Sequence, residues 1–151
     1  FKKQKRNTIF FDGDEFRKIF HDDIKYTLRD RDVNAIRLTS LVKYVSDQKV
    51  NLIISANITS QRFRDWCRKN VKNYFEIFID TPMEILRKRD YKKLYKNAFS
   101  GKIKNVVGVD IKFIKPKKPD LIIDNSSNKR DLYFNYKKIL KEISNKKIKV
   151  Y

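Results

Sequence analysis

The sequence predicts an α/β fold of three layers, in which a parallel β-sheet is flanked by helices. Four short apolar runs, each rich in Ile, Phe or Tyr, end in polar residues, which is the pattern of buried parallel strands. Helical patterns fall between these runs, and strands that alternate with helices pair in parallel through right-handed crossovers. The length of 151 residues fits one domain with a real core.

The predicted strands deliver polar side chains to one edge of the sheet. The first strand, Thr8–Phe11, is followed by Asp12, Gly13 and Asp14. Ligands of an open parallel sheet bind beyond the carboxyl ends of its strands, so we expect the two carboxylates at a binding site. The other predicted strands are Val50–Ala56, Tyr74–Ile79 and Leu121–Ile123.

Helices are predicted between and after the strands. Thr27 and Asp30 form a capping-box pattern that opens a helix, with apolar residues on one face as far as Val45. A helix is also expected before His21, the only histidine, for which we predict a surface or capping role. Further helices are predicted over Ser60–Val71, Pro82–Arg89 and Arg130–Ile143.

Residues 100–119 break the alternation of strands and helices. This basic segment holds two of the three glycines and two of the three prolines of the chain. Long irregular segments in compact domains are more often functional than incidental. We therefore predict a mobile lid over a phosphate site, with a plain surface loop as the alternative.

Composition limits the classes of partner. Lys and Arg number 37 against 18 Asp and Glu, a net charge of +19 that favours anionic partners. We favour a Lys-rich solvated surface over a nucleic-acid-binding module, whose binding would depend steeply on salt. The single cysteine, Cys67, permits no internal disulfide, and no apolar run reaches the ~20 residues of a membrane span. We expect a cytoplasmic protein without a membrane partner.

Asp12, Asp14 and Arg17 form a candidate site for phosphoryl transfer. That chemistry needs a carboxylate near the attacking hydroxyl or Mg²⁺, and cations around the moving phosphate. The cluster supplies both kinds of group. Asp-Gly-Asp after a strand is alone a weak signal, because these residues usually form a turn.

A series of motifs extends this reading. The segment Phe11–Arg17 resembles the "DGD..R" element of adenylylsulfate (APS) kinases, and Asp30–Asn34 matches their "DR..N" at the expected distance. The resemblance covers roughly Thr8 to Asn125 and implies a P-loop-kinase-like fold. Further motifs follow in family order at Ile79–Pro82, Arg89-Asp90, Leu94–Ala98, Gly101–Asn105, Gly108–Asp110 and Pro119–Asp124.

The resemblance implies an ATP- and Mg²⁺-dependent kinase that phosphorylates the ribose 3′-hydroxyl of a nucleotide. Asp12 is then the base or the Mg²⁺-linked carboxylate, Asp14 is its neighbour, and Arg89 lies on the ATP side. Arg62 matches the family's "ISPYR" arginine, although Thr59 and Ser60 replace Ser-Pro. For each arginine the alternative is a surface salt bridge. The substrate-binding residues that the resemblance implies are Arg17, Tyr26, Arg31, Asn34, Arg62, Lys104, Asn105 and Val106.

One departure from the family concerns the phosphate-binding loop. The only glycines are Gly13, Gly101 and Gly108, so no G-x-x-x-x-G-K-[ST] motif occurs among the 151 residues. We expect that loop, with its strand and first helix, upstream of Thr8. We therefore expect residues 1–151 to be an incomplete single kinase domain that does not turn over as printed. A degenerate relative without ATP, kept as a subunit or regulator, is the alternative.

A second departure concerns the base of the substrate. Tyr26 and Val106 stand where APS kinases carry two adenine-stacking phenylalanines, and Val106 offers no aromatic face. The motifs around these positions resemble a branch of the family found in bacterial capsule pathways, which includes a cytidine diphosphoramidate kinase. We favour that substrate, with APS and the production of PAPS in sulfate assimilation as the alternative. The expected partners are the nucleotide substrate and ATP, with a homodimer left open.

Overall fold

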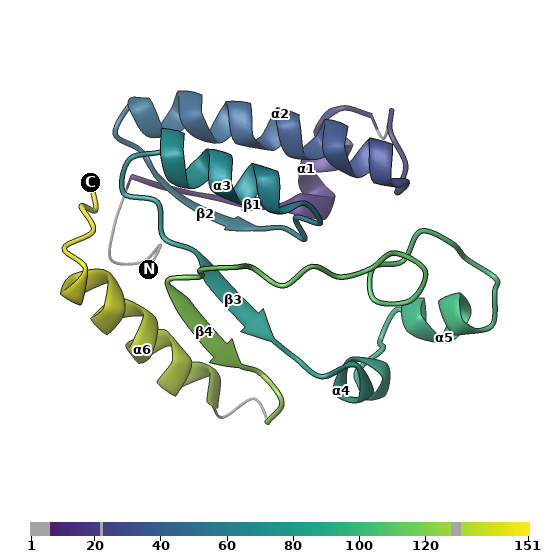
Figure 1. Cartoon of the computed structure of the whole chain (residues 1–151). Coiled ribbons are helices and arrows are strands. Elements are labelled where there is room, and N and C mark those ends of the chain that lie inside the picture. The colour runs from purple at the N-terminus through teal and green to yellow at the C-terminus, as the bar shows by residue number, and fades with distance from the viewer. Residues whose placement is uncertain (1–6, 22, 128–130) are drawn as a thin grey trace. The chain divides into compact units, whose positions relative to one another are not determined.

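The structure is a computed structural model, which describes residues 7–21, 23–127 and 131–151. It divides into two compact units, Phe1–Tyr74 with Lys149–Tyr151 and Phe75–Ile148. Every helix in these described ranges is too short or too polar to cross a membrane. The elements follow one another (Figure 1) as β1 (Thr8–Asp12), α1 (Gly13–Ile19), α2 (Leu28–Asp47), β2 (Asn51–Ser55), α3 (Gln61–Asn70), β3 (Ile77–Asp80), α4 (Met83–Lys88), α5 (Leu94–Phe99), β4 (Leu121–Asp124) and α6 (Asp131–Asn145).

The N-terminal unit is built on one parallel strand pair. β1 pairs with β2 in a register that runs from Thr8 opposite Asn51 to Asp12 opposite Ser55. The helix α2 packs against β2 and α3. Phe16 of α1 and two residues of α2, Leu38 and Val42, form the buried core. Phe11, Phe20, Leu41, Leu52, Ile54, Ile58 and Val71 pack around them.

The predicted capping box at the start of α2 is confirmed. The Thr27 hydroxyl accepts from the Asp30 backbone N–H at 3.2 Å, and the Thr27 N–H donates to the Asp30 carboxylate at 3.1 Å. Two backbone donors of the first turn are satisfied in this way. The hydrogen bond with the Thr27 side chain holds the pKa of Asp30 below its ordinary value.

The C-terminal unit also contains one parallel pair. β3 and β4 run side by side from Ile77 opposite Leu121 to Asp80 opposite Asp124, and α6 packs against β4. All of residues 100–119 are described, and none lies in a helix or strand beyond the isolated bridge between Val107 and Ile111. The predicted irregular segment is therefore confirmed, while its function as a lid stays a prediction.

The α/β class and all four predicted strands are confirmed. The strands form two parallel pairs, β1 with β2 and β3 with β4. The third strand starts at Ile77 and not at Tyr74, because the chain before it makes other bonds: the Glu76 N–H donates to the Asp120 carboxylate at 2.8 Å. The helix α5 was not predicted. The predicted first residue of the last helix, Arg130, lies outside the described residues, and α6 runs from Asp131.

The last residues of the chain belong to the N-terminal unit. The Tyr151 N–H donates to the side-chain oxygen of Asn51 at 2.8 Å, and the Asn51 amide donates back to the Tyr151 carbonyl. The Lys149 N–H donates to Asn73 at 3.4 Å. The start of β2 is thus bonded to residues that follow α6.

Candidate active site

Asp12 ends β1 and at the same time begins α1. Its carboxylate accepts from the backbone N–H groups of Asp14 and Glu15, at 2.9 and 3.3 Å, as a helix N-cap does. Asp-Gly-Asp is therefore the entry of a helix and not an isolated turn. Asp12 is half-buried and Asp14 exposed, and both lie at the carboxyl end of β1.

Gly13 lets the start of α1 approach the end of β2. A Cβ at this position would lie 3.2 Å from the Ser55 carbonyl oxygen and 3.3 Å from Ala56. The Ser55 oxygen and the Ala56 Cα are backbone atoms, which cannot turn aside as a side chain can. A larger residue at position 13 would therefore push the start of α1 away from the end of β2. The spacing of Asp12 and Asp14 relative to β2 depends on this glycine.

Arg17, Tyr26 and Arg31 come together as one cluster, which we call the Arg-Tyr-Arg cluster. Arg17 is only 6% exposed, and its guanidinium donates to the Lys25 carbonyl at 2.9 Å. The Arg17 and Arg31 guanidinium carbons lie 4.8 and 5.7 Å from the centre of the Tyr26 ring. Arg31 also donates to the Tyr26 carbonyl at 3.0 Å. A buried cation in this arrangement is not the surface salt bridge that was the alternative for Arg17.

Asn34 lies one turn after Arg31 on the same side of α2. The residue is 8% exposed, and its side-chain oxygen has no hydrogen-bond partner in the part of the chain that the structure describes. Buried acceptors are almost always satisfied, since leaving one unpaired costs about 1–3 kcal/mol. The structure leaves the Asn34 oxygen buried beside Arg31 without such a partner among the described residues.

Arg62 has a different environment from Arg17. Its guanidinium pairs with the Asp32 carboxylate at 2.8 Å, with 62% of the Arg62 side chain exposed, and stacks over the Phe63 ring at 4.7 Å. This is a surface ion pair between α3 and α2, the alternative considered for each arginine. A part for Arg62 in substrate binding stays a prediction.

The predicted residues of the C-terminal unit lie in the 100–119 segment and after α4. Lys104 is exposed, Asn105 has a left-handed backbone with φ of 64°, and Val106 is 6% exposed. The backbone N–H groups of Asn105 and Val106 both donate to the carboxylate of Asp110. The sequence analysis placed Asp110 in the Gly108–Asp110 motif of the family but gave it no role in the site, although the order Asn105, Gly108, Asp110 is typical of a side chain that caps a tight turn.

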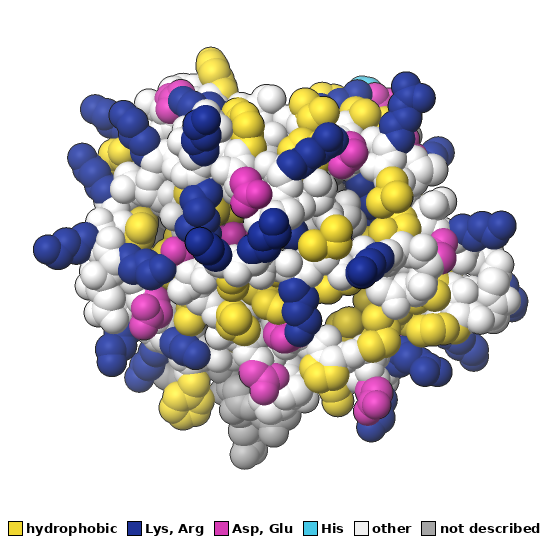
Figure 2. All heavy atoms as spheres, viewed as in Figure 1, with side chains coloured by type: hydrophobic (Ala, Val, Ile, Leu, Met, Phe, Trp, Pro, Cys, Tyr) yellow, Lys and Arg dark blue, Asp and Glu magenta, His cyan; other side chains and the backbone are white. Residues whose placement is uncertain are grey.

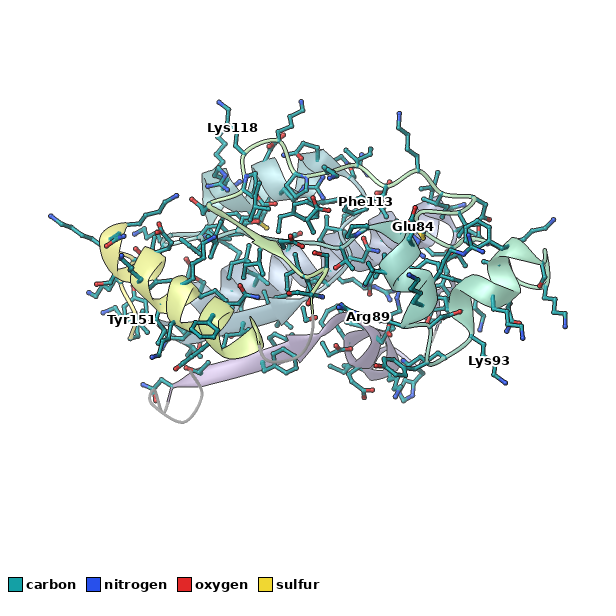
Figure 3. The ribbon with its side chains drawn as sticks, turned by 90° about the horizontal axis from the view of Figure 1, so that it is seen from below. Glu84, Arg89, Lys93, Phe113, Lys118 and Tyr151 are labelled. Carbon is teal, nitrogen blue, oxygen red and sulfur yellow. The ribbon has the colours of Figure 1, made fainter. Side chains whose placement is uncertain are left out.

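Arg89, at the C-terminal end of α4 (Figure 3), binds backbone carbonyls that follow β4. Its guanidinium donates to the carbonyl oxygens of Asn125 at 2.8 Å, Ser126 at 3.4 Å and Ser127. Beside this segment, Asp80, Pro82, Lys115, Ile122, Asp124 and Ser126 line a hollow of about 450 Å³. Lys115 pairs with Asp80 at 2.8 Å, and the Ser126 hydroxyl and N–H hold the pKa of Asp124 below its ordinary value.

The described residues contain no group of three or more His, Cys, Asp or Glu side chains that could enclose a metal ion. Mg²⁺ does not need such a group, because it commonly takes one or two protein carboxylates together with phosphate oxygens and water. One oxygen of Asp12 is engaged by two backbone N–H groups. The Asp12 carboxylate fits a Mg²⁺ held in this shared way.

Lys and Arg side chains are scattered over the face shown in Figure 2, with Asp and Glu among them. Several basic side chains are paired, as in Lys18 with Glu15 and Arg37 with Asp23, both at 2.7 Å. A dispersed distribution of this kind favours the solvated surface over a nucleic-acid face.

An α/β fold with polar groups at the ends of its strands is compatible with a nucleotide phosphotransferase, and comparison with known proteins shows that class. The adenylylsulphate kinase family model matches residues 1–124. A cytidine diphosphoramidate kinase of Campylobacter jejuni is 39% identical over 125 residues, 83% of this chain and 72% of the relative. An adenylyl-sulfate kinase of Buchnera aphidicola is 32% identical over 94% of this chain and 68% of the relative.

A solved structure is similar as well. The APS kinase of Mycobacterium tuberculosis, determined in complex with AMPPNP and APS, superimposes with a TM-score of 0.75 at 27% identity, over 87% of this chain and 79% of that one. The chain belongs to the adenylylsulphate kinase family. Its members are phosphotransferases that act on a hydroxyl group, and the fold is theirs.

Proposed function

We propose that this protein transfers a phosphoryl group from ATP to the ribose 3′-hydroxyl of a nucleoside 5′-phosphate anhydride. The family and the named relatives support the reaction class. The observation that carries the proposal for this chain is the Arg-Tyr-Arg cluster with Asn34 beside it. It offers cations for an anhydride and an aromatic face for a base, with the amide of Asn34 next to them on α2.

Each side chain of the Arg-Tyr-Arg cluster, and Asn34 beside it, has a proposed role that follows from its chemistry. The Arg17 and Arg31 guanidinium groups would bind the anionic part of the substrate with charge-assisted hydrogen bonds, which are about twice as strong as neutral ones. The Tyr26 ring is 46% exposed and would stack on the base. The Asn34 oxygen, which has no partner among the described residues, would accept from the substrate.

Asp12 and Asp14 are proposed to act at the reacting hydroxyl. The Asp12 carboxylate would accept the proton of the 3′-hydroxyl or hold Mg²⁺, and Mg²⁺ would supply charge neutralisation at the phosphates. Asp12 is held in place because the N–H groups of Asp14 and Glu15 fix its carboxylate at the helix start. A fixed base is effective because its proton transfer needs no rearrangement.

The donor side is only partly represented in these residues. A glycine-rich loop that would cradle the ATP phosphates does not occur among the 151 residues, so none of the steps above uses protein groups around ATP. We propose Arg89 on the ATP side, acting through the segment after β4 that it binds. Lys104, Asn105 and Val106 are proposed to take part in acceptor binding.

For the acceptor itself we propose cytidine diphosphoramidate. The Campylobacter jejuni relative with that name is 39% identical, against 32% for the Buchnera aphidicola adenylyl-sulfate kinase. A single aromatic residue, Tyr26, and an aliphatic Val106 suit a pyrimidine better than an adenine held between two rings. APS is the second candidate, because adenylyl-sulfate kinases are similar over as much of the chain.

The deciding experiment measures kcat/KM of the full-length protein with MgATP for both acceptors. We expect turnover of both, with cytidine diphosphoramidate at least as good as APS. A strong preference for APS would make the protein an ordinary adenylyl-sulfate kinase. Failure to phosphorylate either nucleotide, in a folded protein that carries its phosphate loop, would contradict the proposed reaction.

A further inference from the structure

Asp110 closes a compact turn within the 100–119 segment. Both oxygens of its carboxylate are used: one accepts from the Asn105 N–H at 2.5 Å, and the other from the Val106 N–H at 2.6 Å. Hydrogen bonds to an ionised carboxylate are short and strong. They hold the pKa of Asp110 below its ordinary value, with the Asn105 N–H as the largest cause.

The turn is bonded to itself along its whole length. The Val106 carbonyl accepts from the N–H groups of Val109, Asp110 and Ile111 at 3.1 to 3.2 Å, and the Gly108 N–H donates to the Ile111 carbonyl at 2.7 Å. Val106, Val107 and Ile111 are buried. Residues 105–111 are therefore an ordered turn and not a freely moving part of the segment.

The turn also lies tightly against α4. Gly108 has φ of 88°, and a Cβ at this position would be 2.5 Å from the terminal methyl group of Met83. A side chain here would be strained by the backbone angle and would have to displace Met83. The apolar residues of the turn, Val106, Val107 and Ile111, are held by burial, and Gly108 lies next to Met83. The first residues of the turn are held by the Asp110 carboxylate.

We infer that Asp110 is a positioning residue, whose carboxylate sets the backbone of Asn105 and Val106, two residues proposed for acceptor binding. The inference rests on the proposed function in one respect, the assignment of Asn105 and Val106 to the acceptor. An amide at position 110 cannot do the same work, since its oxygen accepts from one N–H while its NH₂ group faces the second donor. Asp110→Asn thus removes one bond and opposes the other at nearly unchanged volume.

The test uses the full-length protein and two kinds of readout. Hydrogen exchange of the Asn105 and Val106 amides is measured without ligands, and KM for acceptor and for ATP is measured with kcat. The matched control is Glu84→Gln, an exposed carboxylate in the first turn of α4 in the same unit. For Asp110→Asn we expect about tenfold faster exchange at both amides and an acceptor KM raised about tenfold, the size of a lost charged hydrogen bond. KM for ATP and the melting temperature should stay near those of Glu84→Gln.

Any other result for Asp110→Asn contradicts a specific part of the inference. Unchanged exchange at Asn105 and Val106 overturns the inference whatever the enzyme phosphorylates. Faster exchange with an unchanged acceptor KM overturns the positioning role and the assignment of these two residues to the acceptor. A parallel loss of melting temperature, kcat and both KM values means that Asp110 only stabilises the fold. Should Asp110→Asn fail to fold, Asp110→Glu keeps the charge on a longer arm and gives the same readouts.

Discussion

The Arg17 guanidinium lies 4.8 Å from the centre of the Tyr26 ring and donates to the carbonyl of Lys25, the residue just before that tyrosine. A buried side chain of α1 therefore holds both the backbone and the ring of the segment that leads into α2. Arg31 holds the same residue from the other helix, at 3.0 Å from the Tyr26 carbonyl.

Replacing these arginines tests whether they face a ligand. Arg17→Ala and Arg31→Ala should each weaken kcat/KM for the acceptor by about 2 kcal/mol or more, because charged hydrogen bonds in a closed site are strong. The control is Lys18→Ala, which removes an exposed ion pair with Glu15 and should cost at most about 1 kcal/mol. If both arginine variants lose no more kcat/KM than Lys18→Ala does, the two arginines do not bind the acceptor.

Asp12→Asn isolates the charge of the proposed base. Asn caps a helix about as well as Asp, so α1 should still begin at the same residue and the protein should fold. The turnover of the full-length enzyme should fall ~10²-fold or more, since the neutral amide cannot take the proton and binds a cation more weakly than a carboxylate does. Glu15→Gln, in the same exposed first turn, should be nearly silent. Activity near that of the wild type in a folded Asp12→Asn protein would exclude Asp12 from the mechanism.

Val106→Phe probes the choice of base. If Val106 stands in the acceptor site, a ring at this position should shift preference towards the adenine nucleotide by about 1 kcal/mol, the size of one aromatic pair. Val106 is 6% exposed, so the larger side chain will also destabilise the fold by about 1–3 kcal/mol. The ratio of kcat/KM for the two acceptors cancels that loss of folded protein. An unchanged ratio would count against Val106 as a determinant of specificity.

Arg89→Ala tests the donor side. The substitution removes donors from the carbonyls of Asn125, Ser126 and Ser127, so the chain after β4 should loosen. We expect KM for ATP to rise about tenfold or more, as for a lost charged hydrogen bond, with the acceptor KM nearly unchanged. Lys88→Ala, at the neighbouring exposed position, is the control. If the KM values for ATP and for the acceptor rise equally, Arg89 has no specific role in binding ATP.

Acid should destabilise the protein in a defined range. Four carboxyl groups have pKa values below the ordinary 3.8, so above that value they are charged in folded and unfolded chains and their stabilising contacts are complete. As the pH falls below 3.8 the unfolded chain binds protons first, and this stability is lost through the lower folded pKa values. Because these carboxylates lie at or near the surface, urea unfolding midpoints should decline modestly there, and less so for Asp30→Asn. The four groups are Asp23, Asp30, Asp110 and Asp124.

The features that the sequence predicted well are formed by residues that are close to one another in the chain. The capping box of Thr27 and Asp30 involves two residues three positions apart, and the structure has both of its bonds. The strands were found because apolar runs that end in polar residues are visible without knowledge of their neighbours. Which strands pair was beyond such a pattern, because strand periodicity says nothing about the partner.

The environment of the arginines could not be read from their spacing. Arg17 and Arg62 follow equally polar segments, yet one is 6% exposed and the other pairs with Asp32 on the surface. The difference depends on packing, because Arg17 follows the buried Phe16 of the core whereas Arg62 lies on an exposed side of α3. The role of Asp110 could not be read from the Gly108–Asp110 motif for a related reason, since its carboxylate binds the backbone N–H groups of Asn105 and Val106.

The bond between Asn51 and Tyr151 joins residues 100 positions apart, so it has a consequence for how the chain acquires its structure. Contacts between distant residues slow folding, because a long loop must be closed before they form. On the ribosome, β1, α2 and β2 are made before the C-terminal unit, whereas the partner of Asn51 is synthesised after that unit. The N-terminal unit can therefore reach its final hydrogen bonding only once residue 151 has left the exit tunnel, which makes its completion a late event of biosynthesis.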